Sequence, residues 1–427
     1  MKFFLFVDVV TNCACCKRGN EQEGRYLRFS FSLSLSFSLF LSGKGAPFNE
    51  MASVASAGAN PKTFTCDFKF TDVRQALLNR GWKLKRPVKS SGKGKGASKT
   101  SGGGVGFVWT NYRRIDFSSL LPTTYVNHLE GVTSLSVKSN LWENVKCKGG
   151  VRAPLTYVVR LSSDKRSVMK AFEEEGEKNK GKVGFKNAWI VKPSGLSRGR
   201  GIEVVDTVER LTASLKSATI PKPLVVQKYI ANPCLLNGKK FDVRVWVAVL
   251  SVDPLVVRMF DKPYARLSSF DFTMEDVTNK FVHLTNNSVQ SKAEDVLRTD
   301  DSAKRDAKIW STDDMVEHFG KSAWEETVMP QFQSMSYKTV EAVAEKGHLK
   351  RFGRGFEMFG FDYMLDEELK VYLIEVNLDP DQSHSTKVTA AIVPEAIQGL
   401  IDLVLQDDQG EGENKKSARG GTWTPIS

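Results

Sequence analysis

The sequence predicts a mixed α/β protein, and three stretches of the 427-residue chain carry that prediction. Residues 239–249, KKFDVRVWVAV, alternate polar and apolar side chains with the period of two that is typical of a β-strand. FGFDYML and KVYLIEV, at 359–365 and 370–376, indicate two more strands joined by a short acidic turn. The mixed-charge stretch at 164–180 is typical of a helix, so strands and helices both contribute.

Composition limits the class of protein. Hydrophobic residues make up 41% and charged residues 26%, as in ordinary globular domains, and the length allows two or three domains or one composite. The sequence has no run of about 18 consecutive apolar residues, so it does not indicate a transmembrane helix. The net charge of +12 indicates an acidic partner, which charge alone leaves open among nucleic acid, an anionic membrane and an acidic protein. The six cysteines show no zinc spacing, which favours a reducing compartment.

The chain divides into four regions. Residues 1–60 hold the Phe-Ser-Leu stretch 28–43, which we interpret as a translated pyrimidine-rich leader, with Met51 as a start site, rather than as structure or a targeting segment. Residues 61–150 predict a small domain with a helix over 72–79 and a flexible basic loop at 86–104. Residues 151–405 hold the dense motifs. Residues 406–427 are predicted to be a disordered tail.

The segment 187–205, NAWIVKPSGLSRGRGIEVV, is the first that indicates chemistry. An apolar strand leads to Lys192, and a loop with Arg198 and Gly199 follows. Glycines let backbone N–H groups approach an anion closely, and the cations add attraction, so the arrangement predicts a polyphosphate site. It is not a P-loop, because the lysine precedes the glycines. The alternative is a Gly-rich hairpin with exposed arginines.

The segment 223–250 is the second. In LVVQKYI, residues 224–230, an apolar run ends at polar Gln227 and Lys228. This pattern resembles a segment whose backbone hydrogen-bonds a flat heterocycle. In the alternating strand that follows, Lys240, Asp242 and Arg244 share one face, and the alternative is the solvated side of an edge strand. A lone histidine near a strand end is more often structural, so we assign no catalytic role to His283.

The predicted hairpin explains why polar side chains stand among its apolar ones. A turn of two or four residues sets Asp362 opposite Leu373, with Glu375 diagonal to Asp362 and Asn377 on the same face. Two carboxylates and an amide are ligands that suit Mg²⁺ completed by water and phosphate oxygens. Without a metal, the two acids would need a lysine or arginine partner.

The order of these motifs resembles the ATP-grasp fold of the tubulin tyrosine ligase-like family. The resemblance covers about residues 120–405 and rests on WIVKP with SRGRGI, VVQKYI, KFDVR, HLTNNSVQ and FEMFGFDYMLDEELKVYLIEVN. It implies an ATP-grasp catalytic region preceded by a smaller N-terminal α/β domain.

The resemblance also implies roles for particular residues. Lys192 would contact the ATP phosphates, with Arg198 and Gly199 in a lid loop, and Lys192 and Arg244 would serve catalysis. Arg266 would hold the incoming amino acid. The remaining residues would frame the adenine (Gln227, Lys228, Tyr229, Ile230), contact nucleotide or line its site (Lys240, Asp242, Thr285, Asn286) and bind Mg²⁺ (Asp362, Glu375, Asn377).

The activity implied is an ATP- and Mg²⁺-dependent ligation. The γ-phosphoryl group passes to a carboxylate on the acidic C-terminal tail of tubulin, and the amine of a free amino acid attacks the acyl phosphate. No covalent enzyme nucleophile is needed. The implied partners are tubulin or microtubules and a free amino acid, with no nucleic acid or membrane, in the cytoplasm and cytoskeleton and in structures such as a ciliary or flagellar axoneme or basal body.

The added amino acid is least determined. We favour glutamate because Arg266 suits a carboxylate-bearing substrate, with tyrosine and glycine as alternatives. Asp379 and Asp381 stand where the family commonly has small residues, and their charge would alter the amino-acid pocket or the Mg²⁺ site. A catalytically silent tubulin-binding protein is a second class. An RNA-binding protein is a third, but the aromatic and basic residues do not interleave in a known RNA-binding pattern.

Overall fold

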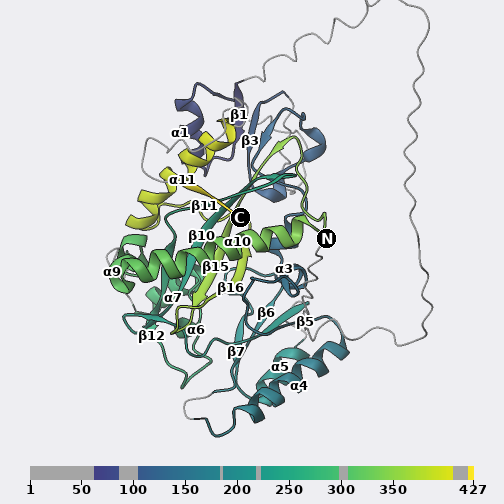
Figure 1. Ribbon diagram of the computed structural model, residues 1–427, viewed down its shortest axis with the longest axis vertical. Helices are drawn as coiled ribbons and strands as arrows, with labels where there is room; N and C mark the ends of the chain where they lie inside the picture. The colour runs from purple at the N-terminus through teal and green to yellow at the C-terminus, as the bar shows by residue number, and fades with distance from the viewer. Residues whose placement is uncertain (1–61, 86–103, 183–185, 218–222, 298–305, 407–421) are drawn as a thin grey trace, which may run out of the picture. The chain divides into compact units, whose positions relative to one another are not determined.

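The computed structural model describes residues 62–85, 104–182, 186–217, 223–297, 306–406 and 422–427, and all of them belong to one unit, Asn60–Ser427 (Figure 1). The expectations for residues 1–60 and for the basic loop at 86–103 lie outside the described residues. Within the described ranges, helices and strands form three sheets with helical layers, which confirms the mixed α/β class.

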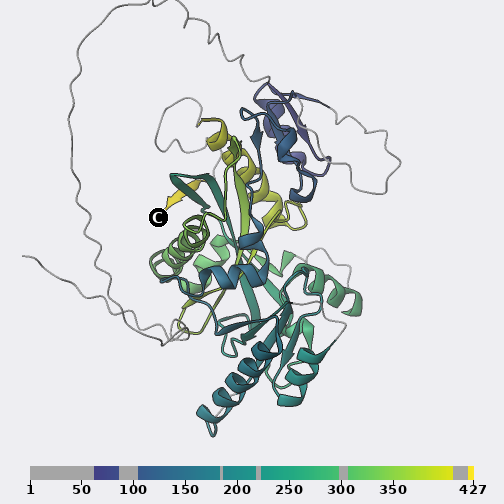
Figure 2. The same ribbon diagram turned by 90° about the vertical axis from the view of Figure 1, so that its right-hand side faces the viewer.

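The first sheet is parallel and is built mainly from the N-terminal part of the chain. Its order is β14-β4-β3-β1-β2, with bounds Arg354–Gly355, Tyr125–Val126, Phe107–Trp109, Thr63–Cys66 and Lys83–Leu84. Helix α1 (Thr71–Asn79) matches the predicted helix and contacts α11 (Lys387–Gln406), beside which both ribbon views draw it (Figures 1 and 2). This sheet therefore shares its apolar core with a helix from the far end of the chain.

The second sheet is antiparallel and is centred on the long strand β10 (Lys239–Val252). One edge of β10 pairs with β15 (Glu357–Leu365), which pairs in turn with β16 (Val371–Asn377). Its other edge pairs with β12 (Tyr264–Asp271) and then with β11 (Leu255–Phe260). The short strands β9, β13 and β17 complete the sheet at Leu235–Leu236, Ile309–Trp310 and Trp423–Ile426.

The central position of β10 in this sheet excludes the alternative that its charged face is the solvated side of an edge strand. A solvated edge strand would expose Lys240, Asp242 and Arg244, but β10 is flanked on both sides and these side chains are 4–6% exposed. On the opposite face Phe241, Val243 and the following alternate valines enter the core, where they pack with α10 (Met329–Ala344) and α3 (Lys138–Val145). The charged face is therefore an interior polar surface.

The third sheet has the order β5-β8-β6-β7, with bounds Thr156–Val159, Leu224–Lys228, Trp189–Pro193 and Glu203–Val205. Helices α4 (Ser162–Lys178) and α5 (Val208–Lys216) pack on the face that holds Trp189. Ile190 and Val204 lie on the other face, in a cluster with Tyr229 and Leu284. That second face, left open by the helices, forms one wall of the candidate site.

The remaining described elements are short or lie at the surface. They are η1 (Tyr112–Arg114), η2 (Phe117–Ser119), α2 (Thr133–Ser136), α6 (Lys280–His283), α7 (Asn287–Leu297), α9 (Thr312–Phe319) and η3 (Ala323–Val328).

The prediction of a disordered tail over 406–427 is wrong at its end. Trp423–Ile426 forms β17, which pairs with β11 and places Trp423 in the core, where its Nε1 donates to Ala396 O at 2.9 Å. Polar composition hid this strand, because one tryptophan and one isoleucine supply its packing. Residues 407–421 lie outside the described residues.

Helix α11 has the length and mean hydropathy of a membrane-spanning helix. The sequence did not indicate this, because polar residues interrupt the apolar ones along the helix. Half of its most apolar window is buried within the fold, including Ile397, Leu400 and Ile401. Packing against α1 and the first sheet accounts for that apolar face.

Candidate active site

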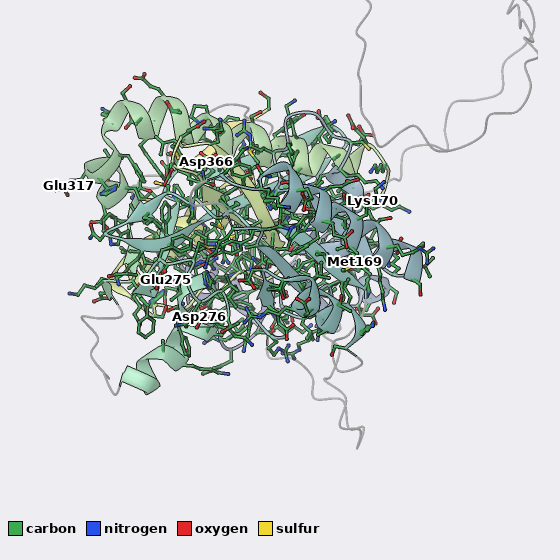
Figure 3. The ribbon with its side chains drawn as sticks, turned by 90° about the horizontal axis from the view of Figure 1, so that it is seen from below. Met169, Lys170, Glu275, Asp276, Glu317 and Asp366 are labelled. Carbon is green, nitrogen blue, oxygen red and sulfur yellow. The ribbon has the colours of Figure 1, made fainter. Side chains whose placement is uncertain are left out.

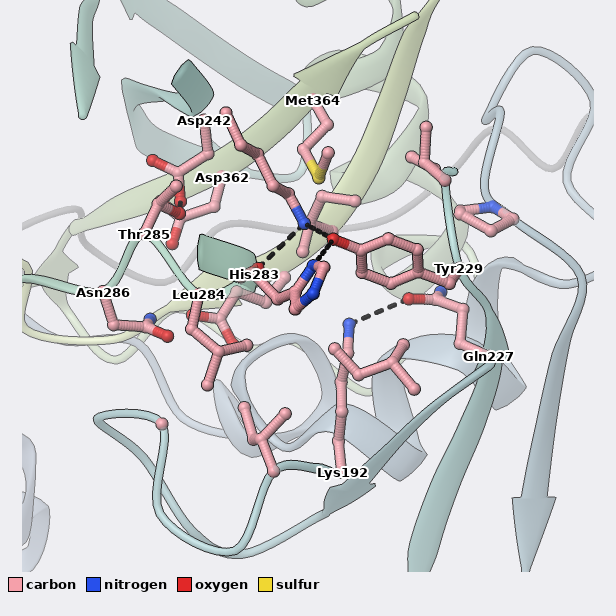
Figure 4. A pocket seen from close by; sticks show the side chains of 18 of the residues that line it. Lys192, Gln227, Tyr229, Asp242, His283, Leu284, Thr285, Asn286, Asp362 and Met364 are labelled. Atoms are coloured by element: carbon pink, nitrogen blue, oxygen red, sulfur yellow. Dashed lines mark hydrogen bonds between the residues drawn. The ribbon is translucent and has the colours of Figure 1, made fainter. Parts of the chain in front are cut away.

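A cleft between the open face of the third sheet and strands β10, β15 and β16 collects most of the predicted site residues (Figure 4). Those that line it are Lys192, Arg198, Gly199, Gln227, Lys228, Tyr229, Ile230, Lys240, Asp242, Thr285, Asn286, Asp362 and Glu375. Arg244, Arg266 and Asn377 stand behind this lining and contact Asp362. The predicted residues therefore form one constellation, although 185 positions separate Lys192 from Asn377.

Lys192 projects into the cleft from the end of β6 and is 5% exposed. Its Nζ donates to Gln227 Oε1 on the neighbouring strand at 2.8 Å (Figure 4). Burial lowers the pKa of Lys192 to about 8, against the attraction of Glu375. A buried ammonium that is hydrogen-bonded to a neutral amide is suited to receive an anion. The anion would stabilise the positive charge in place of the water that burial excludes.

The loop after β6 has the backbone that the glycine pattern predicts. Arg198, Gly199 and Gly201 all have positive φ, at 61°, 69° and 68°. Gly199 is also tightly packed: a Cβ added there would lie 2.6 Å from Val289 Cγ2. The loop is held from the other side by Ser288, whose Oγ donates to Arg198 O at 3.1 Å. Arg198 is exposed at the rim of the cleft.

The segment predicted to frame a flat heterocycle is largely committed to the chain itself. The backbone N–H groups of Lys228 and Tyr229 donate to Leu155 O and Ala188 O at 2.8 and 3.0 Å. Lys228 Nζ donates to Asn187 Oδ1. Gln227, Lys228, Tyr229 and Ile230 all line the cleft, but the N–H groups of Lys228 and Tyr229 are already bonded within the chain.

Behind the lining, two arginines and two aspartates form a buried network. Arg266 donates through Nε and Nη2 to the two oxygens of Asp242, at 2.6 and 2.7 Å, and Nη2 also lies 2.8 Å from Asp362 Oδ2. Arg244 Nε donates to Asp362 Oδ1 at 2.5 Å, and Thr285 Oγ1 donates to Asp242 at 2.5 Å. Burial opposes ionisation of Asp362, but the two guanidinium groups outweigh it and hold the pKa of Asp362 below its usual range.

This network bears on the role expected of Arg266. Its guanidinium is bound by two carboxylates of the chain, and its side chain is about 10% exposed. An arginine held in this way fixes Asp242 and Asp362 in place, which is a different task from gripping a free amino acid. The partner that the hairpin carboxylates would need without a metal is thus present at Asp362, where Arg244 and Arg266 supply it.

The hairpin brings the predicted acids together in a register different from the expected one. Tyr363 pairs with Leu373, but a bulge at Ile374 then sets Asp362 directly opposite Glu375. The prediction that Asp362 faces Leu373 is wrong, because it assumed a regular register. The bulge adds one residue to β16, which moves the partner of Asp362 from Leu373 to Glu375. Asn377 Nδ2 donates to Asp362 Oδ2 at 2.9 Å and to Glu375 Oε1 at 3.3 Å, so one small group already spans both carboxylates.

Lys138 supplies a cation at the same point. It begins helix α3, and its Nζ lies 3.1 Å from Glu375 Oε2 and donates to Leu196 O in the glycine-rich loop. Both side chains are mostly buried. The Lys138 ammonium therefore links helix α3, the loop and the carboxylate hairpin across the mouth of the cleft.

The model of the tubulin-tyrosine ligase family matches residues 118–411 of the chain. The chain belongs to the tubulin-tyrosine ligase family. The matched range runs from η2 through the whole of α11, so it contains every residue that lines the cleft.

Among similar members of this family is tubulin glycylase 3B of Tetrahymena thermophila, 31% identical over 57% of this chain and 20% of its own length. Mouse tubulin monoglutamylase TTLL4 is 28% identical over 67% of this chain and 24% of its own length. Human tubulin polyglutamylase TTLL5 is 32% identical over 51% of this chain and 18% of its own length. The chain thus spans no more than about a quarter of these relatives.

Two site residues of this family member escaped the sequence analysis. Lys138 stands in SVKSNL, where neither glycines nor an apolar strand marks it, and only its place in the lining of the cleft, beside Glu375, reveals it. His283, which we assigned no catalytic role, lines the cleft, and its Nδ1 lies 2.8 Å from the hydroxyl of Tyr229. Its position three residues before Asn286 was the available signal.

Proposed function

We propose that this member of the tubulin-tyrosine ligase family is an ATP- and Mg²⁺-dependent carboxylate–amine ligase with an ATP-grasp fold, and that it adds an amino acid to the acidic C-terminal tail of tubulin. The observation that carries the proposal is the convergence of buried Lys192, Lys240 and Lys138 with the Asp362–Glu375 pair in one cleft. Family membership supports it, as do the similar family members, which are tubulin glycylases and glutamylases.

The residues of the cleft suit the separation of charge that such a ligation requires. Lys192 and Lys240 would hold the phosphates, with Arg198 and Gly199 closing over them, while Arg244 keeps Asp362 ionised and in position. The γ-phosphoryl group passes to an oxygen of the acceptor carboxylate, giving an acyl phosphate and ADP. The amine of the free amino acid then forms the amide bond and releases phosphate, and a proton leaves the nitrogen. Buried fixed cations stabilise such charge better than water does.

The hairpin fits a magnesium ion. Asp362 and Glu375 offer carboxylate oxygens, and the hydrogen bonds from Asn377 Nδ2 to both carboxylates keep the Asn377 side chain beside them. With its amide turned over, Asn377 would add an amide oxygen to this set of Mg²⁺ ligands. When bound there, Mg²⁺ would offset charge on the phosphates. Among the described residues no three His, Cys, Asp or Glu side chains are placed to hold a metal ion together, so a site at this hairpin would need a ligand besides the two carboxylates.

We infer glutamate as the added amino acid and keep glycine as the second candidate, with tyrosine third. Monoglutamylases and polyglutamylases among the relatives support glutamate. Glycine gains from two observations: tubulin glycylases are also among the relatives, and Arg266, which favoured glutamate, is occupied by Asp242 and Asp362. The net charge of +12 suits a polyanionic tail as acceptor, on microtubules of the cytoplasm or of an axoneme or basal body.

The test is incorporation of amino acid into polymerised tubulin by the full chain with Mg²⁺-ATP. Labelled glutamate, glycine and tyrosine are supplied separately, and microtubules from which the acidic tails have been cleaved serve as the matched control. We expect ATP-dependent incorporation of one amino acid into intact microtubules only. If the chain binds microtubules through their tails but incorporates no amino acid, the proposal of a ligase is wrong and that of a catalytically silent tubulin-binding protein takes its place.

A further inference from the structure

A chain of hydrogen bonds runs along the cleft from Lys240 through Tyr229 and His283 to the backbone of Asp276, and Figure 4 labels Tyr229 and His283 in it. Lys240 Nζ lies 2.7 Å from the hydroxyl oxygen of Tyr229 and donates to His283 O at 2.9 Å. The Tyr229 hydroxyl lies 2.8 Å from His283 Nδ1. On the far side of the ring, His283 Nε2 lies 2.9 Å from the backbone oxygen of Asp276. Figure 3 labels Asp276 beside Glu275.

The outer end of this chain fixes the direction of every bond in it. A carbonyl oxygen can only accept, so His283 Nε2 carries the hydrogen that it donates to Asp276 O. In a neutral ring Nδ1 is then an acceptor, and the Tyr229 hydroxyl must donate to it. The Tyr229 oxygen therefore accepts through a lone pair from the Lys240 ammonium, because an ammonium can only donate hydrogen bonds.

Burial is consistent with this assignment. Lys240, Tyr229 and His283 are 4%, 4% and 2% exposed. Burial lowers the pKa of His283, which keeps the ring neutral, and it raises the pKa of Tyr229, which keeps the hydroxyl protonated. The Lys240 ammonium also lies 4.3 Å from the centre of the Tyr229 ring, whose face attracts a cation.

We propose that Tyr229 and His283 are positioning residues that hold the Lys240 ammonium toward the cleft, with His283 acting through the hydroxyl of Tyr229 rather than on the ligand. The inference rests on the proposed function in one respect, namely that the anion received by Lys240 is a nucleotide phosphate. The hydroxyl of Tyr229 then positions Lys240, beyond the framing of adenine that the family resemblance implies. His283 also has a positioning role, although it was assigned no catalytic one.

The first arm of the test reads the relay without any nucleotide. The chain has five histidines, and ¹⁵N-histidine NMR of the full chain gives the tautomer of His283, assigned by the signal lost in His283→Leu. We expect a neutral ring protonated at Nε2 with a hydrogen-bonded Nδ1, and we expect Tyr229→Phe to move the Nδ1 signal toward that of a free acceptor. A ring protonated at Nδ1, or at both nitrogens, would overturn the relay.

The second arm measures ATP affinity by calorimetry. Tyr229→Phe and His283→Leu should each raise the Kd about tenfold, the loss typical of one hydrogen bond to a charged group, and the double variant should be no worse than the poorer single one. His283→Asn, which keeps an acceptor near Nδ1, should recover part of the loss, and His318→Leu on exposed α9 should have no effect. Unchanged affinity in Tyr229→Phe would overturn the positioning role.

The two arms separate the two proposals. If the wild-type chain binds no ATP, the proposed function fails, and with it the nucleotide role of the relay, whereas the tautomer and its response to Tyr229→Phe still show whether the hydrogen-bond chain exists.

Discussion

Arg266 Nη2 lies 2.8 Å from Asp362 Oδ2, and both side chains are buried behind the cleft. The same guanidinium binds Asp242 through two hydrogen bonds, so one planar group sets the spacing of two site carboxylates that lie on different strands. A lysine has the charge of Arg266 but cannot make this forked contact.

Arg266→Lys should therefore lower the free energy of unfolding by roughly 3 kcal/mol, because breaking a buried, hydrogen-bonded ion network is costly. Urea unfolding measures the change. The matched control is Arg210→Lys, whose partner Asp206 lies in an exposed pair and whose replacement should change stability by less than about 0.5 kcal/mol. Equal losses in the two variants would show that the network does not hold the site together.

The loop after β6 offers a test of the predicted lid. Gly199→Ala places a Cβ 2.6 Å from Val289 Cγ2 at a φ of +69°, and it should raise the Kd for ATP on the order of tenfold, given about 1–2 kcal/mol for a side chain in the left-handed region. Gly195→Ala is the matched control in the same loop, because nothing lies within 4 Å of its added Cβ. If both variants bind ATP equally well, the backbone of Gly199 is not part of the site.

ATP affinity should fall as pH rises from about 7 to 9. Burial lowers the pKa of Lys192 to about 8 and that of Lys240 to about 7, so both lose their protons within this range, and the protonated forms are the ones that attract phosphates. Calorimetry across the range measures the slope. Lys240→Arg keeps its charge throughout and should flatten the profile. A profile of the wild-type chain that is flat or rises with pH would contradict this account.

A second pH effect should appear in stability. His128 is buried, and both ring nitrogens face acceptors: Nδ1 is 3.1 Å from the Glu357 carboxylate, and Nε2 is 2.7 Å from Thr110 O. Burial opposes its charge, but Glu357 outweighs burial and raises the pKa of His128. The pair therefore stabilises the fold fully below about pH 6.5, the unfolded value, and less as pH rises through the raised pKa.

His128→Gln isolates this effect, because the difference in unfolding free energy between wild type and variant cancels groups that titrate elsewhere. We expect that difference to shrink as pH rises from about 6 to 9. A difference that stays constant with pH would mean that His128 is not charged in the folded chain.

Local pattern was enough to predict the strands and the facing of their side chains. The alternation in β10 put Lys240 and Asp242 on one face, and the two strands of the hairpin put Asp362 near Glu375. These predictions hold because side-chain direction in a strand depends only on adjacent residues.

What escaped prediction depends on contacts between distant segments. The bulge at Ile374 is a feature of the pairing between two strands, and the link from Lys138 to Glu375 spans 237 residues. Strand β17 pairs with β11, which lies far from it in the sequence. The role expected of Arg266 came from the family resemblance, whereas its two partners lie on β10 and β15. No local pattern records such partners.

The most direct test of the central claim follows the oxygen of the acceptor carboxylate. Tubulin tail peptide labelled with ¹⁸O in its carboxylates is incubated with the full chain, Mg²⁺-ATP and the incorporated amino acid, beside Glu375→Gln. Activation as an acyl phosphate predicts ADP and one ¹⁸O in each released phosphate, both lost in the variant. Phosphate without ¹⁸O, or label recovered in AMP, would contradict phosphoryl transfer to the tail and with it the role of this cleft.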